Sequence, residues 1–112
     1  MALSISAEGD QTAVLSTDHD VGSDTASGGY SGRVDVSALQ AAETITVCLL
    51  TRTRAMGTGA TERCIAHATL TGAPTTTYIL TVEGFCDQGA KLRLKQTGGT
   101  GRLYPWKLLR TV

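Results

Sequence analysis

Few side chains in this sequence are of the types that commonly carry out chemistry. The histidines are His19 and His67, and imidazole is a common general base and metal ligand. His19 lies in Asp18-His19-Asp20, where it is either a base beside a carboxylate or a solvated loop histidine; we expect the second. His67 alternates with small and β-branched residues, which is typical of a half-buried strand histidine with one hydrogen bond.

Three aspartates close in sequence suggest a possible calcium site. Asp18, Asp20 and Asp24 supply the hard oxygen ligands that calcium prefers. The EF-hand pattern is not followed, because Gly22 precedes Asp24 and no terminal glutamate comes after it. We predict no metal site and no cofactor, and an ion at residues 18–24 stays an open alternative to a plain polar loop.

The cysteines Cys48, Cys64 and Cys86 form no recognisable reactive or metal-binding motif. Their spacing fits neither CxxC nor a zinc site, and an odd number argues against a complete disulfide framework. We expect free thiols that act as small core residues in a reducing compartment. A nucleophile also needs an oriented base, and no local signature supplies one, so we expect a protein that is not an enzyme.

Glycine-rich and basic segments near the end of the chain invite a phosphate-binding interpretation. The loop Gly98-Gly99-Thr100-Gly101 is followed by a predicted strand, whereas a phosphate cradle needs a helix N-terminus. The row Lys91, Arg93 and Lys95 is typical of the solvated face of a strand. With a formal net charge of zero, the chain lacks the basic footprint of a nucleic-acid-binding protein.

The last predicted strand concentrates aromatic and basic side chains. Tyrosine, tryptophan and arginine dominate the energetics of protein interfaces. We therefore predict a partner-binding site formed by Arg102, Tyr104, Trp106, Lys107 and Arg110. The alternative interpretation is that Trp106 anchors the core of a small domain.

The elements that position these residues are predicted to be strands. Threonine and valine favour a pleated backbone, and glycine and proline interrupt the chain at short intervals, as in sandwiches and barrels. We place about eight strands, at residues 2–8, 11–17, 30–37, 44–54, 61–71, 77–85, 90–97 and 102–112. Tight turns are expected at Gly9-Asp10 and Met56–Gly59, a long polar loop at 18–29, a helical turn at 37–42, and an edge or bulge at Pro105.

The whole chain, residues 1–112, is predicted to be one all-β domain. Its fold is expected to be an antiparallel β-sandwich, either a jelly roll or an immunoglobulin-like sandwich. No apolar run approaches the roughly 20 residues that cross a bilayer, so no membrane contact is expected. Acids cluster in the first half and bases at the end, which indicates either a molecule with complementary ends for oriented assembly or a chance distribution.

The closing segment, residues 94–110, resembles that of small proteins encoded near the capsid genes of tailed phages. The shared pattern is Lys95-Gln96-Thr97, a glycine-rich loop, Arg102, and the strand Tyr104-Pro105-Trp106. Residues 34–39 through 44–47 also resemble the strand–turn–strand unit of those proteins. The resemblance covers roughly a third of the chain and brings no catalytic residues with it.

The resemblance implies a capsid decoration, or cement, protein: a non-enzymatic virion protein that binds the outer surface of a phage capsid and stabilises it. The implied partners are the major capsid protein and further copies of the chain, with a homotrimer expected. The implied location is the capsid surface after synthesis in the bacterial cytoplasm. The alternative is a tail, neck or receptor- or carbohydrate-binding component, although aromatic platforms for sugars are few.

Overall fold

The computed structural model describes residues 3–52, 62–74 and 78–111. Strands account for 70% of these described residues. They are β1 (Leu3–Thr12), β2 (His19–Asp24), β3 (Gly28–Asp35), β4 (Thr44–Arg52), β5 (Glu62–Thr71), β6 (Ile79–Cys86), β7 (Ala90–Thr97) and β8 (Leu103–Thr111).

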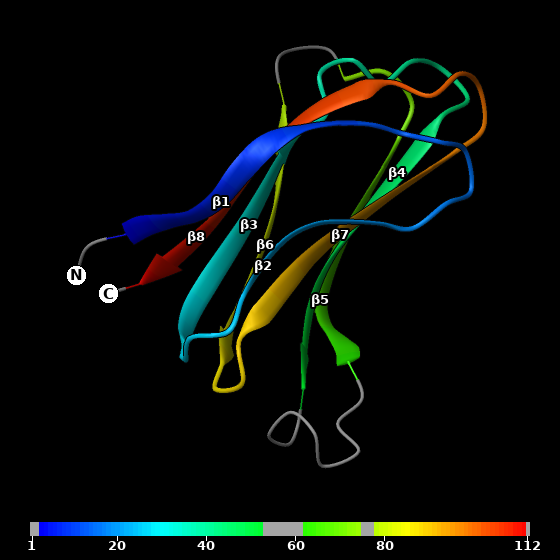
Figure 1. Ribbon diagram of the computed structural model, residues 1–112. Coiled ribbons are helices and arrows are strands. Elements are labelled where there is room, and N and C mark those ends of the chain that lie inside the picture. Colours follow the sequence, from blue (N-terminus) through cyan, green and yellow to red (C-terminus); the bar gives the residue numbers. More distant parts are fainter. Residues whose placement is uncertain (1–2, 53–61, 75–77, 112) are drawn as a thin grey trace.

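The strands form two four-stranded antiparallel sheets packed face to face (Figure 1). One sheet has the order β1-β8-β3-β6 and the other β2-β7-β4-β5. The first strand therefore pairs with the eighth, the second with the seventh, the third with the sixth and the fourth with the fifth. This is a long hairpin rolled into a sandwich, so of the two predicted sandwiches the chain adopts the jelly roll.

The core between the sheets follows the predicted alternation. Ile45, Val47 and Leu49 on β4 are fully buried, as are Leu92 and Leu94 on β7. Each such side chain contributes about 1.5–3 kcal/mol relative to an exposed position. The period-two pattern was thus a correct guide to these strands.

The first thirty residues fold differently from the prediction. Gly9-Asp10 lies inside β1 rather than in a turn, and residues 13–17 are not a strand. The expected polar loop at 18–29 contains β2, which pairs with β7 from His19–Leu94 to Asp24–Ala90. Residues 37–42 form turns rather than a helical turn.

Pro105 lies within a central strand, not at an edge or a bulge. It pairs with Asp10 of β1 in regular register. The Ala13 amide donates to the Arg102 carbonyl across this pair of strands, so by alternation the nitrogen of Pro105 faces β3. The β3–β8 ladder ends at the pair Val34–Trp106 and does not reach Pro105. The missing amide of Pro105 therefore removes no hydrogen bond from that ladder. The predicted turn at Met56–Gly59 lies outside the described residues.

Candidate functional site

The predicted partner-binding residues of β8 do not share one surface. Tyr104 is fully buried in the core, and its hydroxyl donates to Gln96 Oε1 at 2.7 Å. Burial raises the pKa of Tyr104 to about 12, with a further contribution from the Glu43 charge. Tyr104 is therefore an internal residue with no surface for a partner.

Arg102, which is partly exposed, forms an ion pair with the buried Glu43. Its Nη2 lies 2.9 Å from Glu43 Oε2, whose side chain is 2% exposed. Glu43 also accepts from the backbone amides of Gln40 and Thr100, at 2.8 and 3.1 Å. The Arg102 guanidinium is the main cause that lowers the pKa of Glu43 to about 2, and the two amides add to the effect.

Gln96 completes this polar cluster under the glycine-rich loop. Its side-chain amide donates to the carbonyls of Gly98 and Thr100, at 3.1 and 2.8 Å. Its carbonyl oxygen accepts from the Arg102 amide at 3.0 Å. Gln96 and Glu43 thus hold the glycine-rich loop in place by hydrogen bonds to its backbone.

Trp106 closes the open side of the sandwich between β1 and β2. Its indole packs over two glycines, and a Cβ on Gly22 would lie only 2.6 Å from Trp106 Cζ3. Gly9 meets the same ring at 3.2 Å. Trp106 is partly buried and packs against the core. Its packing therefore fits the alternative interpretation, in which Trp106 anchors the core.

Lys107 and Arg110 remain partly exposed. Lys107 Nζ lies 3.8 Å from Glu8 Oε2, with side chains 43% and 57% exposed, a distance at which a surface pair contributes little. Arg110 donates from Nε and Nη2 to the Ser27 carbonyl, at 3.0 and 2.7 Å. Arg110 therefore fixes the β2–β3 turn as well as facing solvent.

The best candidate for a binding site is a groove on the outer face of the β1-β8-β3-β6 sheet. Its volume is about 440 Å³, and we call it the outer groove. Both signs of charge line it beside apolar side chains. The lining residues are Glu8, Gly9, Asp10, Arg33, Asp35, Ile79, Pro105, Trp106 and Lys107.

Cross-strand register explains why these residues meet. Glu8 lies opposite Lys107, which lies opposite Arg33, so charged side chains form a row across three strands. Arg33 is exposed and forms no hydrogen bond or ion pair with other described residues. Its guanidinium is therefore available to a carboxylate on a partner. In the sequence, the alternation of residues 30–37 predicts only that Arg33 faces outward, and no local pattern indicates that it lies in a groove, unpaired among the described residues.

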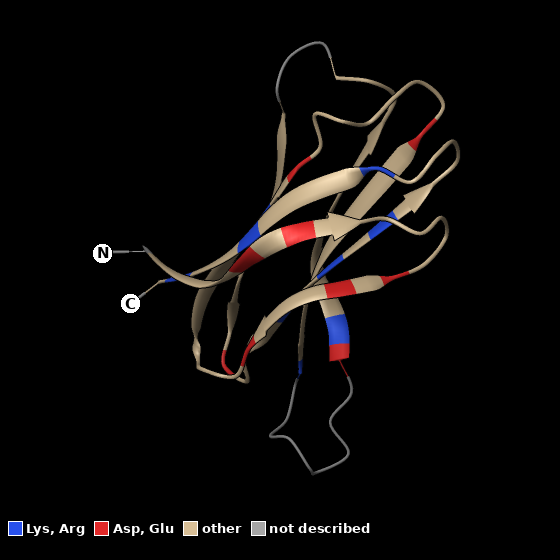
Figure 2. Ribbon diagram, turned by 45° about the horizontal axis from the view of Figure 1, so that its top comes forward, with Lys and Arg blue, Asp and Glu red and all other residues tan. Residues whose placement is uncertain are grey.

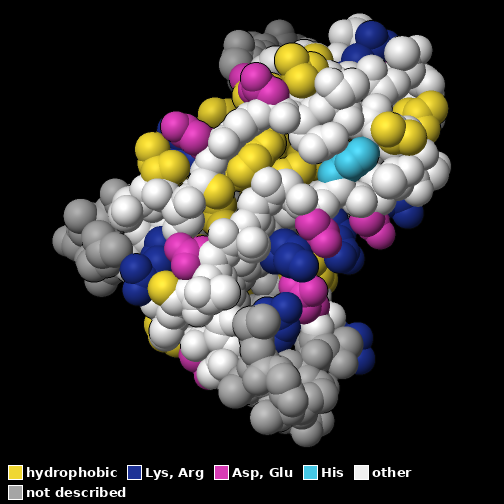
Figure 3. Space-filling model, viewed as in Figure 1, with side chains coloured by type: hydrophobic (Ala, Val, Ile, Leu, Met, Phe, Trp, Pro, Cys, Tyr) yellow, Lys and Arg dark blue, Asp and Glu magenta, His cyan; other side chains and the backbone are white. Residues whose placement is uncertain are grey.

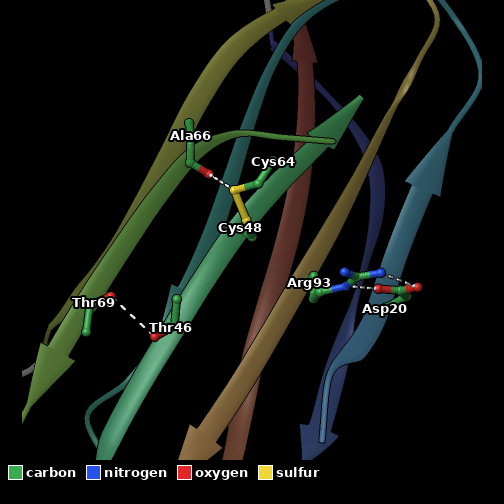
Figure 4. Close-up of a disulfide and its surroundings, with 7 residues drawn as sticks. All are labelled: Asp20, Thr46, Cys48, Cys64, Ala66, Thr69 and Arg93. Atoms are coloured by element: carbon green, nitrogen blue, oxygen red, sulfur yellow. Dashed lines mark hydrogen bonds and ion pairs between the residues drawn. A yellow bond between two sulfur atoms is a disulfide. The ribbon is translucent and has the colours of Figure 1, made fainter. Parts of the chain in front are cut away.

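The opposite outer face, on β2-β7-β4-β5, carries a disulfide and an ion-pair network (Figure 4). Cys48 and Cys64 are bonded, with Cα atoms 5.8 Å apart, so the prediction that they are core thiols is wrong. The register shift at Leu49/Leu50 leaves Ile65 as an extra residue in β5. This bulge turns Cys64 to the outer face, where Cys48 lies.

The third cysteine fits the prediction of a core thiol. Cys86 is free and fully buried. Burial raises the pKa of its thiol, which suppresses the reactive thiolate.

Charged side chains on this face pair with one another. Arg93 donates from Nε to Asp20 Oδ1 at 2.6 Å, and this bond is the main cause that lowers the pKa of Asp20. Lys91 Nζ lies 3.0 Å from Glu62 Oε1. Thr46 and Thr69 join β4 and β5 by a hydroxyl–hydroxyl bond of 3.3 Å. These contacts tie neighbouring strands together.

The remaining candidates for chemistry are dispersed. His19 lies on β2 rather than in a flexible loop, and its Nε2 accepts from the Val14 amide at 2.9 Å. His67 is exposed, not half-buried. Asp24 accepts from the Ala26 amide at 2.9 Å, whereas Asp20 pairs with Arg93. Among the described residues no three acidic, histidine or cysteine side chains gather as a metal site.

Exposed apolar side chains are spread in small groups over the view of Figure 3. The most exposed on the β1-β8-β3-β6 sheet are Ile5, Ile79, Phe85 and Leu103, at 52%, 53%, 72% and 50%. No helix that could span a membrane occurs in the part of the chain that the structure describes. Comparison of the chain with protein families, with curated proteins and with solved structures found no match.

Proposed function

We propose that the chain is a non-enzymatic structural protein that binds the outer surface of a tailed-phage capsid and stabilises it. The attachment surface is the outer groove together with the surrounding outer face of the β1-β8-β3-β6 sheet. The observation that carries this proposal is the composition of the groove. It combines exposed Ile79 and Pro105 with charged side chains, of which Arg33 has no partner among the described residues.

The groove suits a protein surface better than a small molecule. Its residues come from four neighbouring strands of one sheet, so it is a rigid, broad depression. Apolar contact with a rim of charge is the usual anatomy of a protein–protein interface. The charges of both signs allow orientation by complementary groups on a shell subunit.

The fold supports a mechanical role. Jelly rolls recur in viral capsid domains as well as in lectins, and a fold alone does not decide function. Ion pairs, a disulfide and paired threonines bind adjacent strands together. Copies attached at symmetry-related positions of a shell resist its expansion jointly, so each modest contact is amplified by multiplicity.

A co-sedimentation assay tests the proposal. Capsids of the phage that encodes the chain are prepared without it and mixed with the purified protein. We expect saturable binding at a fixed ratio to the major capsid protein and a gain in heat resistance. Failure to bind any capsid form would exclude this function and direct attention to tail components and glycans.

A charge-reversed pair of variants localises the binding surface. Arg33→Glu places a carboxylate in the outer groove and should weaken capsid binding by about tenfold or more, the range for loss of a charged interface contact. Arg63→Glu is the matched control, because Arg63 is also an exposed strand arginine but lies on β5 in the other sheet. Equal loss in both variants would contradict attachment through the outer groove.

A further inference from the structure

The edge strands of the two sheets are protected unequally against pairing with another chain. Register shifts interrupt the pairing of β1 at Ile5/Ala7, of β2 at Asp20/Gly22 and of β5 opposite Leu49/Leu50. Such bulges disfavour addition of a further strand. The fourth edge strand, β6, pairs with β3 in unbroken register from Gly28–Cys86 to Asp35–Ile79.

The side chains of β6 also lack the usual protection. Glu83 is its sole charged residue, and it contains no lysine or proline. Its outward positions include Ile79 and Phe85, which are 53% and 72% exposed. A regular edge strand with exposed apolar ends is a template for strand addition.

The free hydrogen-bonding groups of β6 can be assigned from its first contacts. The Val36 amide donates to the Tyr78 carbonyl at 3.0 Å, and the Tyr78 amide donates to Ser37 Oγ at 3.1 Å. The backbone of Tyr78 therefore faces β3. Because direction alternates along an antiparallel strand, the amides and carbonyls at positions 79, 81, 83 and 85 face the free edge, and no described strand pairs with them.

We propose that β6 pairs antiparallel with β6 of a second copy of this chain, about a two-fold axis at Val82. In this register Ile79 lies opposite Phe85 of the second copy, and Thr81 lies opposite Glu83. All of the free backbone groups then meet their counterparts in hydrogen-bonded pairs, giving about eight new bonds. The β1-β8-β3-β6 sheets of the two copies then form one continuous eight-stranded sheet.

The self-complementarity of the strand is what selects a second copy as the occupant. A two-fold contact requires one surface to match itself. Here the exposed isoleucine at one end covers the exposed phenylalanine at the other, and a favourable cross-strand apolar pair forms twice. Glu83 faces threonine rather than another glutamate, so the register brings no like charges together.

This assembly differs from the trimer implied by the resemblance. A ring of three copies needs two different surfaces on each copy, whereas this contact uses one surface twice. The inference is independent of capsid binding, since it concerns the purified chain alone. Two outer grooves would then lie on the same face of one sheet.

Matched lysine variants test the contact by analytical ultracentrifugation. The wild-type chain is expected to sediment as a dimer, at twice its 11.7 kDa mass. Ile79→Lys should raise the dimer dissociation constant about a hundredfold, because each of two copies loses a contact worth about tenfold. Ile5→Lys is the control, since Ile5 is equally exposed, at 52%, on the opposite edge of the same sheet, and it should leave the dimer intact.

A proline variant tests the backbone bonds separately. Thr81→Pro removes an amide that faces the free edge and leaves the β3 ladder in place, the arrangement in which proline is tolerated in a sheet. It should weaken the dimer about tenfold or more while the thermal transition of the monomer is retained. In the wild type, the Thr81 and Glu83 amides should exchange with deuterium more slowly as protein concentration rises.

The proposal is overturned by any of three results. The first is a wild-type chain that stays monomeric, with deuterium exchange at the amides of positions 81 and 83 independent of protein concentration. The second is a wild-type trimer. The third is a dimer that persists in both Ile79→Lys and Thr81→Pro. Loss of the dimer in Ile5→Lys alone would place the contact on β1 instead.

Discussion

Tyr104 illustrates how residue type alone can suggest the wrong role, and Arg102 shows that a residue of an interface type also has a structural partner. Both belong to the types that dominate interfaces, yet both serve the fold, through Glu43 and Gln96. Glu43 is 59 positions away from Arg102 along the chain. No local pattern in the sequence could reveal that pairing, whereas Trp106 was recognised as a possible core anchor.

The Glu43–Arg102 pair predicts a particular dependence of stability on pH. The folded pKa of Glu43 is about 2, below the ordinary 4.5, so its stabilising effect is complete above the unfolded pKa. That effect is lost as pH falls through the folded pKa, between about 4.5 and 2. The free energy of unfolding, measured in urea, should fall across this window and fall less steeply in Glu43→Gln.

A second variant removes the cation of the pair and keeps the carboxyl group of Glu43. Arg102→Met leaves a buried carboxylate without its cation and should destabilise the chain more than Glu43→Gln near neutral pH. The two variants should converge at about pH 2, where the carboxyl group is protonated. Equal stability of the two variants at neutral pH would contradict the expected penalty of an unpaired buried carboxylate in Arg102→Met.

Gly99 in the glycine-rich loop and Gly72 just after β5 offer a matched pair of substitutions. Gly99 and Gly72 have φ angles of +66° and +87°, where an alanine costs about 1–2 kcal/mol. A Cβ on Gly72 meets open space, whereas one on Gly99 would collide with the Glu43 side chain. Gly99→Ala should therefore lower the free energy of unfolding by about 1–3 kcal/mol more than Gly72→Ala, and an equal loss in both would contradict the assigned packing of Glu43.

Among the strands, the sequence predicted β3 to β8 close to their observed positions and missed β2. Residues 90–97 alternate leucine with charge, and β7 has those bounds. β2 contains one large apolar residue, Val21, so its hydrophobic period is too weak to distinguish it from a loop. The bulge at Ile65 reverses the direction of Cys64, and a bulge cannot be read from a period-two pattern.

The disulfide between β4 and β5 predicts a measurable stabilisation. It joins residues separated by 16 positions, and a closed loop of about 15 residues is worth about 3 kcal/mol. Cys48→Ala/Cys64→Ala should lose about 2–4 kcal/mol in urea unfolding. Reductant should destabilise the wild type similarly and leave the double variant unchanged.

A thiol titration checks the bond itself. In denaturant without reductant, the wild-type chain should react with one equivalent of a thiol reagent, at Cys86. Reaction at all three cysteines would contradict the disulfide.

At the scale of the whole molecule, the uneven charge of the sequence does not produce two oppositely charged ends. Acids from the first half pair with bases from the second across neighbouring strands, as in Glu8–Lys107 and Asp20–Arg93. Figure 2 shows the two signs interspersed over both sheets. The expectation of complementary ends is therefore wrong, and specificity has to come from a local surface such as the outer groove.

We propose that the β1-β8-β3-β6 face attaches the chain to a capsid. A cryo-electron microscopy reconstruction of capsids saturated with the purified protein tests it most directly. We expect added density at symmetry-related positions on the outer surface, with the outer groove and Arg33 against the shell. A bare capsid, or density that contacts the shell through the β2-β7-β4-β5 face, would contradict it.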